Sequence, residues 1–381
     1  MKVLLVAGAR PNFMKIAPVL AALRAAGDHV ILVHTGQHYD ARMSDAFFHD
    51  LDLPDPDFYL DVGSGSHAVQ TARVMEAFEP VLLEVEPDWV VVVGDVNSTL
   101  ACSLVAAKLK AETGCRIAHV EAGLRSHDWR MPEEINRILT DRLSDLLLIP
   151  STDAIANLAE EGIDPARIAF VGNVMIDTLL AQLPAARAAA TAQRLRLITG
   201  EYSVVTLHRP SNVDSAETLR PILEALAELA KDRPVVFPVH PRTRKNADAF
   251  GLGALLGALA AIEPLSYVEM LSLTDGAALV LTDSGGLQEE TSVLGVPCIT
   301  LREQTERPIT ITAGTNRLAE WPLTRDGIVA AARRALTNGR HAAQALPGWD
   351  GKAGARVARA LHLWHGSAVD RPRAPDQLIG V

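Results

Sequence analysis

Short runs of aliphatic and β-branched residues recur along the chain, each followed by a glycine-rich or polar turn and then by a longer stretch of helical character. This alternation is typical of βαβ units, in which parallel strands form a sheet covered by helices. The runs predicted as strands are residues 3–6, 30–34, 90–93, 117–120 and 146–149 in the first half, and residues 202–207, 235–238, 279–281 and 298–301 in the second. The sequence therefore predicts an α/β protein with two similar halves.

The segments between these runs complete the predicted architecture. Helices are predicted at residues 16–26, 100–110, 216–229, 287–294 and 326–337. Residues 50–61 and 63–66 are predicted as loop. Residues 184–197, with Pro184 in the first turn, are predicted to begin the second domain with a helix or to form a connector to it.

The chain length predicts two domains. A domain usually has roughly 100–200 residues, and the chain has 381. The junction is predicted near residues 171–173, which gives an N-terminal domain of residues 1–171 and a C-terminal domain of residues 172–351. The helical pattern at about residues 352–365 predicts a last helix that packs back on the N-terminal domain.

Composition excludes several classes of partner. Hydrophobic residues are 48% of the chain and charged residues 22%, as in globular proteins, and the net charge of -10 argues against binding to nucleic acid or to an anionic membrane. Cys102, Cys115 and Cys298 are too widely spaced for a metal site or a disulfide framework. Because no secretion signal and no membrane-spanning apolar run is recognisable, we expect a soluble, cytoplasmic protein.

The loops that follow the predicted strands are rich in polar residues, and ligands of parallel sheets bind beyond the carboxyl ends of the strands. The first loop, residues 8–15, combines backbone amides with Arg10 and Lys15 where a helix begins, which suits a diphosphate. It lacks the glycine spacing of a dinucleotide site. An ordinary strand–helix turn with solvated cations is the alternative.

Three acids follow strands of the first half or begin a helix there. Asp95 follows a buried strand, although an N-cap is the commoner role for Asp in that position. Glu121 ends the next strand, where a carboxylate is costly unless it is paired. Glu133 follows Pro132 at a predicted helix start and faces Arg137 at i,i+4, which is also a structural pattern. If the three carboxylates meet, they suit proton transfer.

The second half offers a second set of polar loops. His208 and Arg209 follow one predicted strand, and His240 and Arg242 follow another. The strongest local signal is the segment TDSGGLQEE, in which Ser284, Gly285 and Gly286 present a hydroxyl and backbone amides to a phosphate, and Glu290 is placed to reach ribose hydroxyls. A glycine-rich turn without a ligand is the alternative. Arg307 lies in a further polar loop, after the strand at residues 298–301.

The motifs taken together resemble those of the non-hydrolysing UDP-N-acetylglucosamine 2-epimerases. They run in order from GARPNFMK through GQH, GDVNSTLA, HVEAGLRS, PEEINR, GNVMID, LHRP, PVHPR and LTDSGGLQEE to TERPITITAGTNRL. The resemblance implies two Rossmann-like domains around a central cleft, of the glycosyltransferase-B type, in a homodimer. It also implies elimination of UDP to a 2-acetamidoglucal and re-addition of UDP after protonation on the other face of C2, without cofactor or metal.

The resemblance also implies roles for individual residues. It implies catalytic roles for Asp95, Glu121, Glu133 and His208, without saying which acid serves which face of C2. The residues implied in binding the UDP-sugar are Arg10, Lys15, Arg125, His240, Arg242, Tyr267, Ser284, Gly285, Gly286, Glu290 and Arg307.

Some residues depart from the family pattern. Tyr39 and Asp40 stand where members activated by a second substrate molecule tend to carry Arg-Gln or Arg-Glu, and the segment between Glu121 and Glu133 is short. Activation by substrate is therefore not expected, although Arg73, Arg209 and His240 match the regulatory set. The alternatives are a 2-epimerase of a diacetamido sugar, a glycosyltransferase of the same fold, a hydrolysing epimerase and a non-catalytic sensor.

Overall fold

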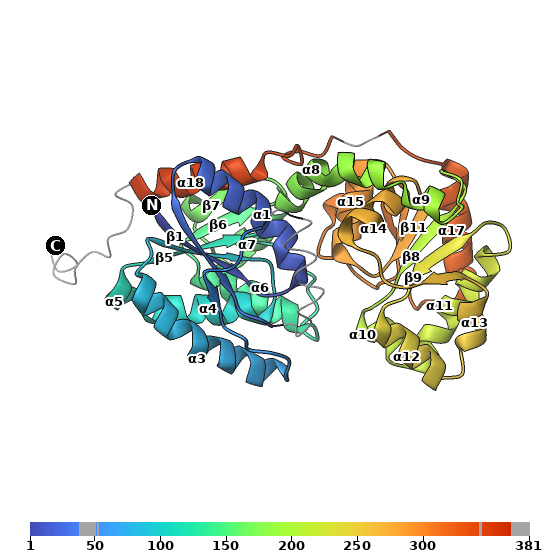
Figure 1. The fold of residues 1–381 in the computed structure, drawn as a ribbon, viewed down its shortest axis with the longest axis horizontal. Coiled ribbons are helices and arrows are strands. Elements are labelled where there is room, and N and C mark those ends of the chain that lie inside the picture. The colour runs from blue at the N-terminus through green and yellow to red at the C-terminus, as the bar shows by residue number, and fades with distance from the viewer. Residues whose placement is uncertain (38–50, 52, 343–344, 367–381) are drawn as a thin grey trace.

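The computed structural model of the chain describes residues 1–37, 51, 53–342 and 345–366, without the side chains of residues 10 and 11. It contains two α/β domains that lie side by side, each with a parallel sheet between layers of helices (Figure 1). The α/β fold with two similar halves, expected from the sequence, is confirmed.

The N-terminal sheet has seven parallel strands among the described residues, in the order β3-β2-β1-β4-β5-β6-β7. Going across the sheet, the strands are β3 (Phe58–Tyr59), β2 (His29–His34), β1 (Lys2–Ala7), β4 (Trp89–Val93), β5 (Arg116–Val120), β6 (Leu146–Ile149) and β7 (Ile168–Phe170). Every residue of β4 is buried, because helices cover both faces of the sheet. This double burial explains why the strand is a continuous apolar run.

Alternate residues of β1 point to opposite faces of the sheet and into different cores. Val3 and Leu5 pack on the face that carries α1 (Arg10–Ala25), and Leu4 and Val6 pack on the face that carries α3 (His67–Val85) and α4 (Asn97–Lys108). The other helices of this domain are α5 (Lys110–Thr113), α6 (Pro132–Leu143) and α7 (Ala154–Glu160).

The C-terminal sheet repeats this architecture with six parallel strands among the described residues, in the order β10-β9-β8-β11-β12-β13. They are β10 (Ala260–Ile262), β9 (Val235–Pro238), β8 (Ser203–Thr206), β11 (Leu279–Thr282), β12 (Cys298–Thr300) and β13 (Asn316–Leu318). The helices are α10 (Pro210–Val213), α11 (Ala216–Leu229), α12 (Pro241–Ala249), α13 (Gly253–Gly257), α14 (Tyr267–Asp275), α15 (Gly285–Leu294), α16 (Ile309–Thr312) and α17 (Arg325–Asn338). In both sheets the strand order reverses after the third strand along the chain, as in Rossmann folds.

The chain crosses between the domains twice. It leaves the N-terminal domain through α8 (Val174–Ala189), which continues into the short α9 (Thr191–Arg194), and it returns to α18 (Ala353–Gly366). The two crossing segments are in contact just before α8 and just before α18, since a Cβ on Gly172 would lie 1.9 Å from the carbonyl oxygen of Gly348. Gly172 also has φ +87°, so glycine is required there twice over.

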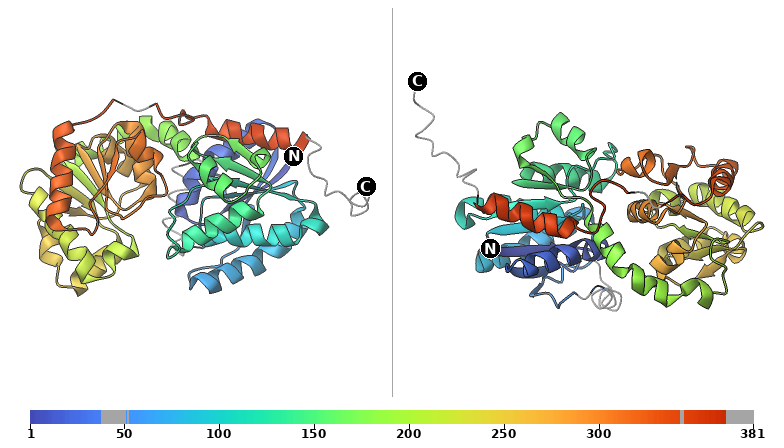
Figure 2. Two further views of the ribbon diagram at one scale, coloured as in Figure 1. Left: turned by 180° about the vertical axis from the view of Figure 1, so that it is seen from behind. Right: turned by 90° about the horizontal axis from the view of Figure 1, so that it is seen from above.

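Helix α18 lies along α1 of the N-terminal domain, beside the N-terminus of the chain (Figures 1 and 2). The two helices approach so closely that a Cβ on Gly354 would lie 2.5 Å from the carbonyl oxygen of Pro18. Asp177 of α8 accepts the N–H groups of Ala353 and Gly354 at 3.0 and 2.7 Å and so caps α18. The exact domain limits of residues 171 and 351 stay a prediction.

Two local expectations were wrong. Pro184 was expected near the start of a helix, but α8 begins ten residues earlier in the chain, at Val174, and Pro184 lies inside it. The loop expected at residues 50–61 contains β3, and β7, β10 and β13 were not predicted. No described helix has the length and hydropathy needed to span a bilayer.

Candidate active site

Several of the predicted site residues lie in the loops and helix starts that follow the carboxyl ends of the strands, where both sheets reverse their strand order. These reversals lie between β1 and β4 in one domain and between β8 and β11 in the other. Such switch points are the usual binding places of open parallel sheets. The residues around each reversal, and the contacts between them, therefore define the candidate site.

Lys15 and Glu121 meet at the switch point of the N-terminal domain. The Lys15 ammonium is paired with Glu121 Oε2, and both side chains are buried. Gly94 lies against them, with φ +69°, and a Cβ on it would lie 3.0 Å from Lys15 Nζ and 3.4 Å from Glu121 Oε2. The segments after β1, β4 and β5 thus converge on one carboxylate. The sequence placed Lys15 and Glu121 at the site but did not predict that they pair.

The backbone of Glu121 is in the left-handed region, with φ +72°. This conformation is uncommon for a residue other than glycine and is found disproportionately at functional sites. The Glu121 N–H donates to the carbonyl of Leu148 in the neighbouring strand at 3.0 Å. The surrounding strands therefore impose a backbone conformation that turns this carboxylate toward Lys15.

Asp95 is paired with Arg137 of α6, whose Nη1 lies 2.5 Å from Asp95 Oδ2. Burial raises the pKa of Asp95, but the charges of Arg137 and Lys15 outweigh burial and bring it below its usual value. Asp95 is therefore an ionised carboxylate at neutral pH. It does not act as the N-cap of α4, because Val96 occupies that position.

Arg137 does not pair with Glu133, contrary to the expectation from i,i+4 spacing. Its guanidinium binds Glu134, at i,i+3, with Nη2 at 2.6 Å and Nε at 2.9 Å from Oε2. Glu134 also accepts the N–H groups of Ser126 and His127, which fixes the loop before α6. Glu133 is half-buried, and its side chain makes no hydrogen bond or ion pair with the residues that the structure describes.

His208 is held by Asp283 at the switch point of the C-terminal domain. Its Nδ1 lies 2.9 Å from Asp283 Oδ1, and Asp283 also accepts the backbone N–H groups of His208 and Arg209. Asp283 is buried, whereas the His208 side chain is 45% exposed. The ring of His240, which caps α12 through Nδ1, lies 6.4 Å from the His208 ring.

The segment Ser284-Gly285-Gly286 forms the N-terminus of α15. Ser284 is the N-cap, and within the described structure its side chain makes no capping hydrogen bond, so the first N–H groups of the helix are left for an anion. A Cβ on Gly285 would lie 2.7 Å from Arg307 Nη1, and one on Gly286 would lie 2.8 Å from Met175 Cε. A side chain at either position would therefore displace the end of Arg307 or of Met175.

Glu290 lies one turn further along α15 and is buried. The Tyr267 hydroxyl donates to its Oε1 at 3.1 Å. Burial raises the pKa of Glu290 to about 7, with the Tyr267 hydrogen bond opposing and the charge of Glu289 adding to the rise. Two predicted binding residues, Tyr267 and Glu290, thus contact each other in the C-terminal domain.

Arg307 joins the two domains. Its guanidinium binds Glu121 Oε1 with Nη2 at 2.8 Å, Glu289 Oε1 with Nε at 2.8 Å and Glu306 Oε1 with Nη1 at 2.5 Å. Glu121 comes from the N-terminal domain and the other partners come from the C-terminal domain. The acid at the first switch point and the helix N-terminus at the second are therefore linked through one buried cation.

Other predicted binding residues are not brought to this cluster. Arg125 is buried and engaged by Asp141 and Glu161, and Arg242 is half-exposed and paired with Asp214. Arg10 begins α1, but its side chain lies outside the described structure, as do Tyr39 and Asp40.

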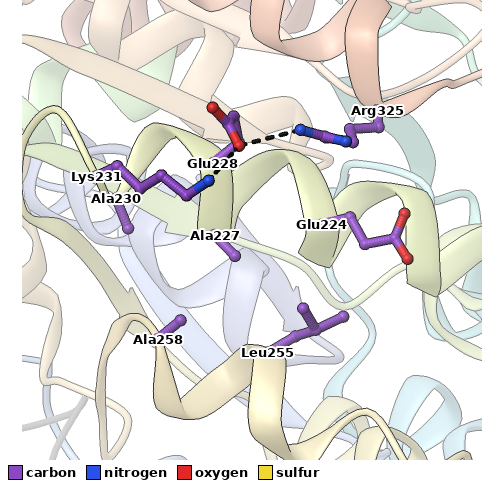
Figure 3. Close-up of a pocket in the computed structure, with 8 residues that line it drawn as sticks. All are labelled: Glu224, Ala227, Glu228, Ala230, Lys231, Leu255, Ala258 and Arg325. Atoms are coloured by element: carbon purple, nitrogen blue, oxygen red, sulfur yellow. Dashed lines mark hydrogen bonds and ion pairs between the residues drawn. The ribbon is translucent and has the colours of Figure 1, made fainter.

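A surface depression of about 400 Å³ lies elsewhere, between α11 and α13 (Figure 3). Its floor is apolar and its rim carries charged side chains. It is lined by Glu224, Ala227, Glu228, Ala230, Lys231, Leu255, Ala258 and Arg325. None of the predicted site residues lines it.

A family model described as UDP-N-acetylglucosamine 2-epimerase matches residues 21–362, which is most of the chain. The chain belongs to this family. A UDP-N-acetylglucosamine 2-epimerase of Methanocaldococcus jannaschii is 42% identical over 369 residues, covering 95% of this chain and 99% of the relative. A UDP-2,3-diacetamido-2,3-dideoxy-D-glucuronate 2-epimerase of Pseudomonas aeruginosa is 45% identical over 340 residues, covering 88% and 92%.

Solved structures of the 2-epimerase family share the fold of this chain. The crystal structure of the UDP-GlcNAc 2-epimerase of M. jannaschii, in complex with UDP-GlcNAc and UDP, superposes with a TM-score of 0.87 at 41% identity. The alignment covers 95% of this chain and 100% of the other. Membership of the 2-epimerase family, inferred from the motifs, is thus confirmed by sequence and by structure.

Several charged residues that contact the predicted residues of the candidate site were not identified from the sequence. Arg137 and Glu134 were treated as helix-start residues, and Asp283, Glu289 and Glu306 were treated only as neighbours of the motif residues. A signal was present for Glu289 and Glu306, since each is an acid directly adjacent to a predicted binding residue, Glu290 or Arg307. Their common partner, Arg307, was identified as a ligand for substrate rather than as a bridge.

Proposed function

We propose that the chain catalyses the reversible inversion of C2 of UDP-N-acetylglucosamine, which gives UDP-N-acetylmannosamine. The observation that carries the proposal is the bridge from Glu121 through Arg307 to the N-terminus of α15. It places a carboxylate suited to proton transfer beside a site suited to a diphosphate. An enzyme that breaks the bond between C1 and UDP while removing the C2 proton needs both.

The diphosphate is expected at Ser284, Gly285 and Gly286, where unpaired helix amides and Arg307 favour negative charge. Lys15 and Arg10 of the N-terminal domain are also proposed to bind the diphosphate, and Glu290 to bind the ribose hydroxyls. As the C1–O bond breaks, its electron pair leaves with UDP, and these cations stabilise the added charge. The close approach of Arg307 Nη1 to Gly285, where a Cβ would lie only 2.7 Å away, supports this arrangement.

Proton transfer at C2 is assigned to the acids of the N-terminal domain. A base takes the C2 proton as UDP departs, the C1–C2 double bond forms, and an acid then delivers a proton to the opposite face as UDP returns. Asp95 is ionised through Arg137, which suits the base role, and Glu133 is free of ion pairs within the described structure. His208, held by Asp283, completes the proposed catalytic set.

We also propose that the enzyme acts as a cytoplasmic homodimer. Apolar side chains are exposed on two helices of the N-terminal domain, namely Val69 and Leu83 on α3 and Ile135 and Leu139 on α6. Burial of such side chains favours association. The three cysteines are free thiols, which fits a reducing compartment. Light scattering of the purified protein should give twice the mass of the chain.

The proposed reaction is tested with UDP-N-acetylglucosamine as the only substrate. Proton and phosphorus NMR should show UDP-N-acetylmannosamine forming to an equilibrium mixture without added cofactor. Free N-acetylmannosamine with UDP would indicate the hydrolysing reaction, and no change until an acceptor is added would indicate a glycosyltransferase. Because the P. aeruginosa relative is named for a diacetamido-glucuronate substrate, that sugar is run in parallel. A higher kcat/KM for it would change the assigned substrate.

A further inference from the structure

His119 and Asp141 form a buried pair that the proposed mechanism does not use. His119 belongs to β5, two residues before Glu121, and Asp141 belongs to α6. His119 Nδ1 lies 2.6 Å from Asp141 Oδ1, and His119 Nε2 lies 2.8 Å from the carbonyl oxygen of Gly94. Neither side chain has any exposed surface.

Both contacts of the His119 ring are with hydrogen-bond acceptors. Gly94 offers a carbonyl oxygen, which can only accept. Burial raises the pKa of Asp141, but its interactions with His119 and Arg125 outweigh burial and bring it below its usual value. Independently of His119, Asp141 Oδ2 is paired with Arg125 and accepts the Gly123 N–H, so Asp141 is a carboxylate that also only accepts. A neutral imidazole carries one N–H, and an imidazolium carries two. The geometry therefore requires hydrogen on both nitrogens of His119.

The charge balance of the surrounding cluster agrees with an imidazolium. Arg125 Nη2 lies 2.7 Å from Asp141 Oδ2, and Arg125 Nε lies 2.6 Å from Glu161 Oε1. With His119 charged, two cations face two carboxylates. Asp141 is fully buried, whereas the Glu161 side chain is 30% exposed to solvent, so Asp141 is the carboxylate whose charge an imidazolium helps to compensate.

The pair is connected to the loops that carry two of the proposed catalytic acids. Through His119 it holds the carbonyl of Gly94, one residue before Asp95. Asp141 Oδ2 accepts the N–H of Gly123 at 3.0 Å, two residues after Glu121. These hydrogen bonds hold the loops after β4 and β5 in place next to Glu121. Glu121 has φ +72°, a conformation that persists only when the surrounding structure enforces it.

We propose that His119 and Asp141 are positioning residues, which as a buried hydrogen-bonded pair fix the separation of Asp95 and Glu121 and take no part in proton transfer. This inference rests on the proposed epimerase function. Misplacement of a reacting group by about 1 Å can cost on the order of 10²-fold in rate. Loss of the pair should therefore lower kcat and leave UDP binding unchanged, because the UDP contacts lie mainly in the C-terminal domain.

The protonation state is tested first, on the full-length wild-type protein without substrate. Histidine is labelled with ¹⁵N, and His119→Gln identifies the resonances of His119. The NMR spectrum is recorded at the pH used for the activity measurements. Both ring nitrogens of His119 should still carry hydrogen. One protonated and one bare nitrogen would overturn the proposal, whatever reaction the enzyme catalyses.

The positioning role is tested with Asp141→Asn and a matched control, Asp145→Asn. Asp145 also holds β5, since its Oδ2 accepts the N–H of Ile117 at 2.9 Å, but at the far end of the strand from the acids. Asp141→Asn should lower kcat about 10²-fold, by the same misplacement argument, with unchanged calorimetric affinity for UDP and an unchanged shape of the pH–rate profile.

The control variant Asp145→Asn should keep the wild-type kcat. Equal kcat values for the two variants, or a new ionisation in the profile of Asp141→Asn, would overturn the positioning role. If the wild-type enzyme forms no epimer, the proposed function fails, while the NMR result on His119 stands.

Discussion

Replacement of Glu290 with glutamine should stabilise the protein while weakening its binding of UDP. Glu290 is 4% exposed, and burial raises its pKa from the ordinary 4.5 to about 7. Between pH 4.5 and 7, the folded protein therefore keeps a proton on Glu290, whereas the unfolded chain has lost it. Because the folded state binds more protons in this window, its stability falls as pH rises through it.

The size of the effect follows from the pKa values. A difference of about 2.5 pH units, at about 1.4 kcal/mol for each, corresponds to about 3 kcal/mol of stability lost above pH 7. Glutamine has the same shape, can accept the Tyr267 hydrogen bond and carries no charge, so it should recover most of this energy. The Tm should rise by several degrees, at about 2–4 °C per kcal/mol for a domain of 150–250 residues.

Urea denaturation of wild type and Glu290→Gln at pH values above 7 and below 4.5 measures the effect. The gain should be present in alkaline solution and absent in acid. Glu228→Gln is the control in the same domain, on the rim shown in Figure 3, where the hydrogen bond from Lys231 lowers the pKa of Glu228. That variant should gain no stability at any pH. A Glu290→Gln protein that is no more stable than wild type above pH 7 would refute the reasoning.

Three further outcomes are expected. Gly285→Ala should weaken the calorimetric affinity for UDP about tenfold or more. Its Cβ would lie 2.7 Å from Arg307 Nη1 and so displace a guanidinium whose charge-assisted hydrogen bond to the diphosphate contributes about 1.5–3 kcal/mol. Unchanged affinity would show that Arg307 does not bind UDP. Saturating UDP should reduce the radius of gyration in small-angle scattering, since the proposed phosphate ligands come from both domains and the crossings meet at Gly172. An unchanged radius would count against closure. Initial rates should depend hyperbolically on UDP-N-acetylglucosamine, and a sigmoidal curve would show that Arg73, Arg209 and His240 suffice for activation.

The sequence predicted the central strands well because of how they are buried. Strands such as β4 are covered on both faces, so every residue from Trp89 to Val93 is apolar and the run is easy to recognise. The missed strands lie at or next to the edges of their sheets and have two or three residues each. In β7, for example, Phe170 is 40% exposed, so the segment lacks the continuous burial that marks a strand.

The sequence also predicted that the polar loops after the strands come together, since the carboxyl ends of parallel strands lie at one edge of a sheet. It could not predict the partners of the charged residues. Arg307 and Glu121 are 186 positions apart, and their pairing depends on how the two domains pack. Arg137 binds Glu134 and Asp95 rather than Glu133, and helical spacing does not reveal a partner such as Asp95 that comes from another loop. Arg125 resembled a binding residue but is held by Asp141 and Glu161.

The fate of the C2 hydrogen tests the central claim most directly. Elimination and re-addition on opposite faces must exchange this hydrogen with solvent, whereas a glycosyltransferase leaves it in place. In heavy water, NMR should show deuterium at C2 of both the gluco and the manno UDP-sugars. Glu121→Gln should slow the exchange by about 10²–10⁴-fold, the usual contribution of a positioned proton-transfer group, while still binding UDP. Epimer that forms without deuterium at C2 would contradict the account.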